Sequence, residues 1–98
     1  MLTGKQRRQL RALGHHLSVV VQVGSDGVTE GVIAAAAQAL EDHELIKVKL
    51  AGDDRASRLE AVDALAKGTE AEIAQTLGKT VLLWKKRKKK SKIALVEG

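Results

Sequence analysis

Two glycines separated by two residues, Gly24 and Gly27, form the local pattern with the most specific chemistry. They follow an apolar, β-branched run and precede Thr29, a residue type that caps helices, so a strand, a loop and a helix are predicted. Glycine permits positive φ and leaves room for a phosphate to approach backbone N–H groups at the start of a helix. GXXG loops clamp a nucleic-acid backbone in this way. A plain β-to-α turn explains the glycines equally well, and Asp26, beside Ser25 in the loop, would repel phosphate.

Basic side chains without interspersed acids offer a second chemistry, the neutralisation of phosphates. Residues 1–23 carry four basic residues and no acid, and residues 85–98 carry seven basic residues and one acid. Residues 24–44 carry five acids and no base, so the net charge of +5 arises at the two ends. A solvated helix face or an edge strand that resists aggregation would also explain some of these positions. The candidate phosphate contacts are Lys5, Arg7, Arg8, Arg11, Lys47, Lys49, Lys79 and Lys85.

The side chains that enzymes and metal centres use are sparse and scattered. Cysteine is absent, and His15, His16 and His43 lack the two-histidine spacing of a metal site on one helix face. No set of Ser, His and Asp is arranged as nucleophile, base and orienter. We therefore predict a protein that is not an enzyme, with no cofactor and no metal. No apolar run approaches the roughly 20 residues that span a bilayer, so a cytoplasmic protein without a membrane partner is expected.

Seven elements should position these residues, in the order α-β-α-β-α-β-β. The first helix should begin at Thr3, which forms a capping box with Gln6, and end at Gly14 in a left-handed conformation. The run over residues 17–23 is typical of a strand that is covered on both faces or lies centrally in a sheet. The residues expected on the apolar arc of the first helix are Leu2, Leu10 and Leu13.

Residues 44–51 alternate in polarity and predict a strand with one core face, while the face that carries two lysines is at least partly wet. The next helix should be capped by Asp53 or Asp54 and end at Gly68. The residues expected on its apolar stripe are Leu59, Val62, Leu65 and Ala66.

Two further strands, at residues 70–77 and 79–85, lie close enough in sequence to form a hairpin. Each β-α-β crossover should place parallel strands side by side, and the hairpin adds an antiparallel pair. We therefore predict an α/β fold (α+β, two-layer) with a four-stranded mixed sheet, as a single domain over residues 1–85. Residues 86–98 should form a basic, flexible C-terminal tail. The indole of Trp84, beside this tail, would either stack on a base or cover the core.

The loop and its flanks resemble a known family. The matching segments are the basic opening LTGKQRRQLRALGHHL, the run VQVGSDGVTEGVIAAAAQALEDHELIKVKL and, near the end, GKTVLLW. Over about residues 2–85 the chain resembles the CRM domain family (chloroplast RNA splicing and ribosome maturation), in particular its stand-alone bacterial YhbY-like members. The resemblance implies an α/β architecture similar to the C-terminal domain of translation initiation factor three.

The resemblance also implies an RNA-binding module, associated with large-subunit (pre-50S) precursors in bacteria and with group II introns in plant organelles. It implies that the loop from Gly24 to Gly27 faces RNA and that basic residues extend this surface. With a single aromatic residue, the chain should recognise the phosphate backbone rather than stack on bases. We expect it to assist ribosome biogenesis by binding ribosomal RNA, with ribosomal proteins as further partners. The alternative is a protein-binding assembly module whose acidic segment, residues 41–44, docks a basic ribosomal protein.

Overall fold

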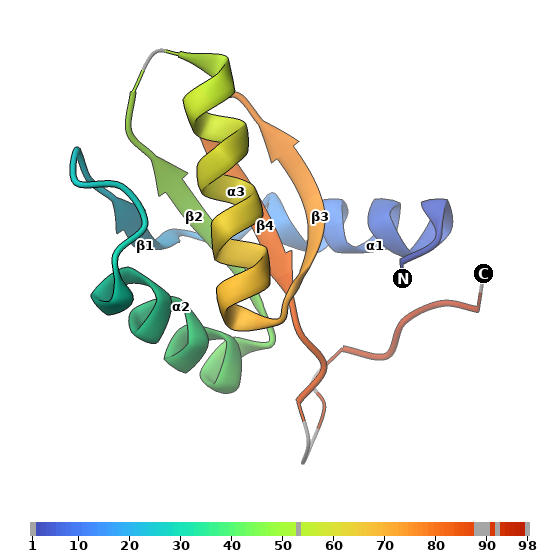
Figure 1. The fold of residues 1–98 in the computed structure, drawn as a ribbon. Helices are drawn as coiled ribbons and strands as arrows, with labels where there is room; N and C mark the ends of the chain where they lie inside the picture. Colours follow the sequence, from blue (N-terminus) through green and yellow to red (C-terminus); the bar gives the residue numbers. More distant parts are fainter. Residues whose placement is uncertain (1, 53, 88–90, 92, 98) are drawn as a thin grey trace.

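The computed structural model describes residues 2–52, 54–87, 91 and 93–97. In this part of the chain, three helices and four strands follow the predicted order (Figure 1). The helices are α1 (Gly4–Gly14), α2 (Glu30–His43) and α3 (Arg55–Thr69). The strands are β1 (Val19–Val23), β2 (Leu45–Leu50), β3 (Glu72–Leu77) and β4 (Thr80–Trp84). Asp53, one of the two predicted caps of α3, and part of the basic block in the predicted tail lie outside the described residues.

Local sequence signals determine where the helices begin. The Oγ1 of Thr3 accepts a hydrogen bond from the Gln6 N–H at 3.2 Å, and the Gln6 Oε1 accepts one from the Thr3 N–H at 3.0 Å. This is the predicted capping box, and it satisfies two of the N–H donors at the start of the helix. Thr29 and Asp54 cap α2 and α3, each by accepting a hydrogen bond from a backbone N–H in the first turn.

Two glycines that were expected to end helices are instead packing positions. Gly14 is the last residue of α1, and the helix is capped by His15 in the right-handed conformation, with φ of −58°. A Cβ on Gly14 would lie 2.5 Å from Cδ1 of Leu82, so a larger residue here would require Leu82 or the helix to shift. Likewise, α3 continues past Gly68, where a Cβ would lie 2.6 Å from Cδ1 of Ile33 on α2.

The sheet has the strand order β1-β2-β4-β3. β1 pairs with β2 in parallel, whereas β4 pairs antiparallel with both β2 and β3. The predicted mixed sheet is confirmed, but the second crossover does not place parallel neighbours side by side, because β4 lies between β2 and β3. β1 is consequently an edge strand, and the expectation of a central or fully covered strand is wrong, since Val20 is 49% exposed.

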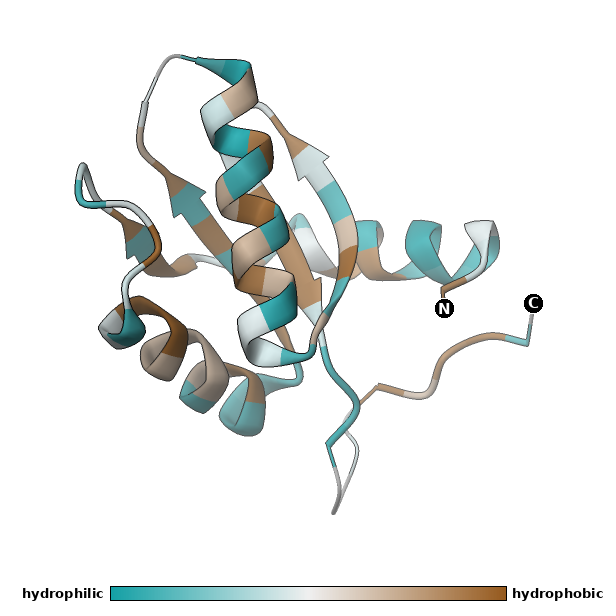
Figure 2. Cartoon of the chain, viewed as in Figure 1, coloured by the Kyte–Doolittle hydropathy of each residue, from teal (hydrophilic) through white to brown (hydrophobic). Residues whose placement is uncertain are grey.

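Helices cover both faces of the sheet (Figure 1). α2 and α3 pack on one face, where Ile46 and Val48 are at most 1% exposed. α1 crosses the other face, where Leu10 packs in a cluster with Trp84, so the indole covers the core. The strands are among the most hydrophobic segments in Figure 2, as this double coverage requires. The predicted two layers therefore describe α2, α3 and the sheet, and α1 adds a partial third layer.

Two leucines predicted on apolar helix stripes are largely exposed: Leu13 is 43% exposed and Leu59 is 48% exposed. In α1, the close contact at Gly14 turns the buried side of the helix away from Leu13. In α3, the buried residues include Val62 and Leu65, and Leu59 lies beside that stripe. Among the described residues, no helix is both long enough and apolar enough to cross a membrane.

The described residues of the C-terminal segment lie along α1. The Gln6 Nε2 donates a hydrogen bond to the Val96 carbonyl at 3.0 Å. Gln9 donates to the Ala94 carbonyl and accepts from the Val96 N–H, both at 2.8 Å. The apolar side chains that pack on the α1 cluster from this segment are Ile93 and Leu95. The division into a domain and a flexible tail stays a prediction, although these contacts connect the described part of the tail to α1.

A buried glutamate also connects this segment to the domain. Glu44 lies between α2 and β2 with φ of 68°, and it is 0% exposed. Its carboxylate accepts hydrogen bonds from Nε1 of Trp84 at 3.3 Å, the hydroxyl of Ser91 at 2.8 Å and the N–H of Ile93 at 3.2 Å. Glu44 therefore does not belong to the acidic surface that the protein-docking alternative requires.

Candidate nucleic-acid interface

The four strands of the described sheet each have one terminus at the same side of the sheet, where the loops connect them (Figure 1). β1, β2 and β3 end there and β4 begins there, because β4 runs antiparallel to both of its neighbours. We call this the loop edge; it comprises residues 24–29, 51–52 and 78–79 and the first turn of α3, with its cap Asp54. The Leu50 N–H donates to the Lys79 carbonyl at 2.6 Å and joins two of these segments.

The loop from Gly24 to Gly27 is a tight, exposed turn at this edge. The Gly27 N–H donates to the Gly24 carbonyl at 3.0 Å, and Gly27 has φ of 79°. Other residue types are strained at this φ, so the turn itself requires Gly27. Gly24 has no such requirement, and a Cβ on it would meet no atom within 4 Å. Ser25 and Asp26 are exposed. The free space at Gly24 is therefore where a sugar-phosphate backbone could approach.

One of the predicted basic residues, Lys49, lies near this loop, and Lys47 and Arg11 lie farther along the sheet face that α1 partly covers. Lys49 is exposed near the end of β2 and lines the same shallow hollow as Gly24. Lys47 is half-buried and lines a second hollow together with Arg11, near the C-terminal end of α1. Burial decreases along this face of β2, from the buried Leu45 to Lys47 and then to the exposed Lys49. The predicted partly wet face of β2 is confirmed.

The remaining predicted residues are separated by the fold. Lys79 is exposed in the β3–β4 turn, at the loop edge itself. Lys85 follows β4 at the opposite edge of the sheet, where its Nζ donates to the Thr69 carbonyl at 3.0 Å. The exposed basic residues in the N-terminal half of α1, which extends away from the loop edge in Figure 1, are Lys5, Arg7 and Arg8.

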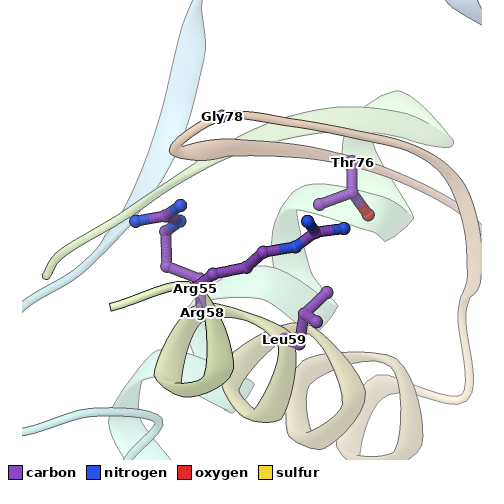
Figure 3. A pocket seen from close by; sticks show the side chains of 5 residues that line it. All are labelled: Arg55, Arg58, Leu59, Thr76 and Gly78. Atoms are coloured by element: carbon purple, nitrogen blue, oxygen red, sulfur yellow. The ribbon is translucent and has the colours of Figure 1, made fainter. Parts of the chain in front are cut away.

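Two arginines at the loop edge were not among the predicted residues. They stand at the start of α3 and line a hollow of about 320 Å³ opposite the β3–β4 hairpin (Figure 3). Their spacing of three residues directly after the cap Asp54 is the sequence signal that could have identified them. The hairpin on the other side of the hollow could not be inferred from that signal. The residues that line the hollow are Arg55, Arg58, Leu59, Thr76 and Gly78.

Two exposed acidic side chains also lie at this edge. Asp26 is exposed in the glycine loop. The carboxylate of Asp54 is engaged in the α3 cap, where the Ser57 hydroxyl, followed by the Ala56 N–H, lowers its pKa. Among the residues that the structure describes, no group of three or more His, Asp and Glu could hold a metal ion. Besides these two carboxylates, the loop edge combines accessible backbone with cationic side chains, which is the chemistry of phosphate binding.

Proteins of known sequence are similar to this one over nearly the whole chain. The CRS1/YhbY (CRM) domain matches residues 2–85. A probable RNA-binding protein, YqeI, from Bacillus subtilis is 42% identical over 95 residues, which are 97% of this chain and 99% of the relative. A probable RNA-binding protein from Pseudomonas aeruginosa is 43% identical over 91 residues, which are 93% of this chain and 88% of the relative. The names of both relatives describe binding and name no reaction.

A solved structure is similar to the same extent. The solution structure of a hypothetical protein from Staphylococcus aureus, described as a candidate RNA-binding protein, is 33% identical and superposes with a TM-score of 0.85. The similarity covers 98% of this chain and 100% of that one. The sequence resemblance and the three-dimensional fold thus agree. This chain belongs to the CRS1/YhbY (CRM) domain family.

Proposed function

We propose that this protein binds RNA through the loop edge, mainly by contacts to the phosphate backbone. The observation that carries the proposal is the convergence of an open glycine loop, Lys49 and two arginines at one edge of the sheet. Trp84, the single aromatic residue, is only 8% exposed, which leaves no aromatic platform on which bases could stack. The names of the relatives support RNA as the ligand. A binding role, rather than catalysis, fits these features.

A Gly24→Leu variant tests whether RNA approaches the glycine loop. Because a side chain at Gly24 meets no protein atom within 4 Å, the fold should tolerate it. The leucine should exclude one or two phosphates and lower RNA affinity by about ten-fold at 0.1 M salt, measured by fluorescence anisotropy with labelled ribosomal RNA fragments. The matched control is Gly4→Leu, which also meets no atom within 4 Å and lies at the far end of α1. Unchanged affinity in Gly24→Leu would favour the plain-turn explanation.

We further propose that the ligand is ribosomal RNA in precursors of the large subunit, in the cytoplasm, and that binding assists ribosome assembly. Recognition through phosphates suits a folded RNA whose shape, rather than sequence, positions its backbone. Ultraviolet cross-linking in cells, followed by sequencing of the bound RNA, should enrich a small number of sites in the large-subunit precursor. Reads spread over messenger RNAs would contradict this assignment. Ribosomal proteins are the proposed further partners, and binding to ribosomal particles that survives nuclease digestion would support them.

A further inference from the structure

The hollow between α3 and the β3–β4 hairpin has features that the fold itself does not require. It has a volume of about 320 Å³ and opens at the loop edge (Figure 3). This volume is at the lower end of the range of small-ligand pockets, so it suits a single small group and is far too small for a duplex. Gly78, at the hairpin turn, has φ of 56° and carries no side chain that would narrow the opening.

Two guanidinium groups flank the hollow. In Figure 3 the side chains of Arg55 and Arg58 diverge, and their guanidinium groups lie on opposite sides of the opening. The Nη1 of Arg58 donates to the Gly52 carbonyl at 3.3 Å, which restrains this side chain before any ligand binds. A guanidinium group binds phosphate through paired N–H donors and can also stack on a flat ring. Of the described residues that line the hollow, none is acidic.

An apolar side chain lies beside one of these cations. Leu59 is 48% exposed although it belongs to a helix with a well-buried stripe, and it lines the hollow below the hairpin. Thr76 adds a hydroxyl group on the hairpin side. Two cations with an apolar surface beside one of them match a nucleotide within a chain, because phosphates flank each nucleoside on both sides while the base presents a flat, weakly polar face.

We propose that this hollow binds one unpaired nucleotide of the RNA, extruded from a bulge or loop. The base lies against Leu59 and a guanidinium plane, and the flanking phosphates contact Arg55 and Arg58. This inference rests on the proposed function, because the hollow adjoins the surface that contacts the RNA backbone. It adds a preference that phosphate contacts alone do not provide, namely for RNA in which a base is free to leave the stack.

The test compares two RNA hairpins with the same stem, one of which carries a single unpaired adenosine. The wild-type protein should bind the bulged hairpin about ten-fold more tightly, as expected from stacking of one base. An Arg55→Gln/Leu59→Ser variant should lose this preference. The matched control, Arg8→Gln/Leu13→Ser, makes the same changes at exposed positions of α1 and should keep it. Both variants replace exposed side chains, and circular dichroism would verify that both are folded.

The outcomes separate this inference from the proposed function. If the wild-type protein binds both hairpins equally, or if the α3 variant keeps the preference, the nucleotide site is wrong while RNA binding stands. If the wild-type protein binds neither hairpin, both the nucleotide site and the proposed RNA-binding function are wrong. A second measurement uses the free protein and adenosine 5′-monophosphate, with inorganic phosphate as the comparison. Adenosine 5′-monophosphate should shift the amide NMR signals of Leu59, Thr76 and Gly78 in the wild-type protein and not in the α3 variant. If inorganic phosphate produces the same shifts in full, the proposed contact with the base is wrong.

Discussion

A Glu44→Ala variant should lose about 3 kcal/mol of the free energy of unfolding, which corresponds to a fall of roughly 15 °C in Tm for a domain of this size. The carboxylate is 0% exposed and accepts hydrogen bonds from Trp84, Ser91 and Ile93. Hydrogen bonds to a charged group are individually strong, and removal of the carboxylate leaves the buried indole N–H without this acceptor. Chemical denaturation measures the loss directly.

Two variants identify the cause of that loss. Glu41→Ala removes an exposed glutamate three residues earlier, on α2, and should change stability by no more than about 0.5 kcal/mol. Ser91→Ala removes one donor and leaves the carboxylate in place, so a loss of about 1 kcal/mol is expected. Trypsin should also cleave the basic segment after β4 faster in Glu44→Ala under native conditions. Equal stabilities of the Glu41 and Glu44 variants would show that the buried carboxylate does not connect this segment to the domain.

The second large effect concerns the distribution of charge. An Arg11→Gln/Lys47→Gln/Lys49→Gln variant should bind RNA about 100-fold more weakly at 0.1 M salt. Each neutralised phosphate on a single strand contributes about 0.7 to the slope of log K against log salt. At 0.1 M salt, one such contact therefore raises the RNA affinity roughly five-fold. The three losses in affinity multiply, and the magnitude of the slope of log K against log salt should decrease by about two. Affinities measured across a series of salt concentrations give both quantities.

A matched variant, Lys5→Gln/Arg7→Gln/Arg8→Gln, removes the same number of charges from the exposed N-terminal half of α1. Because these residues lie away from the loop edge, affinity should fall only a few-fold and the slope should change by less than one. Equal losses in the two variants would mean that RNA responds to the net charge of +5 and not to a particular surface. Thermal unfolding of both proteins controls for the half-buried position of Lys47.

Local features of this fold can be predicted from the sequence because they depend on neighbouring residues. The capping box at Thr3 and the caps at Thr29 and Asp54 involve hydrogen bonds over two or three residues. The alternation along β2 follows from the two-residue period of a strand, and the structure places its lysines on the wetter face as expected. Interactions of this range are encoded within a short window of the chain.

Features that depend on distant segments could not be predicted in the same way. The same local sequence patterns are compatible with several strand orders, so they do not show that β4 lies between β2 and β3. Gly14 and Gly68 resemble helix terminators, and only the packing against Leu82 and Ile33 shows their role. Glu44 belongs to an acidic sequence segment, yet its hydrogen-bond donors from β4 and the tail are 40 to 49 residues away.

The candidate site shows the same division. The glycine loop and Lys49 were recognised because residue type and local order suffice to place them at the end of a strand. Arg55 and Arg58 were missed because their significance comes from the hairpin across the hollow, about 20 residues later in the chain. Lys85 was grouped with the others on charge alone, and the direction of β4 places it at the opposite edge.

The position of β4 in the sheet has a consequence for biosynthesis. β4 is the last strand of the described chain, yet it forms the ladders with both β2 and β3. While the polypeptide is being made, β1 and β2 can pair first, but β3 finds its partner only when β4 has emerged. Until then, two strand edges stay open to unwanted pairing with other nascent chains. The hairpin side of the hollow beside α3 also forms only at that last step.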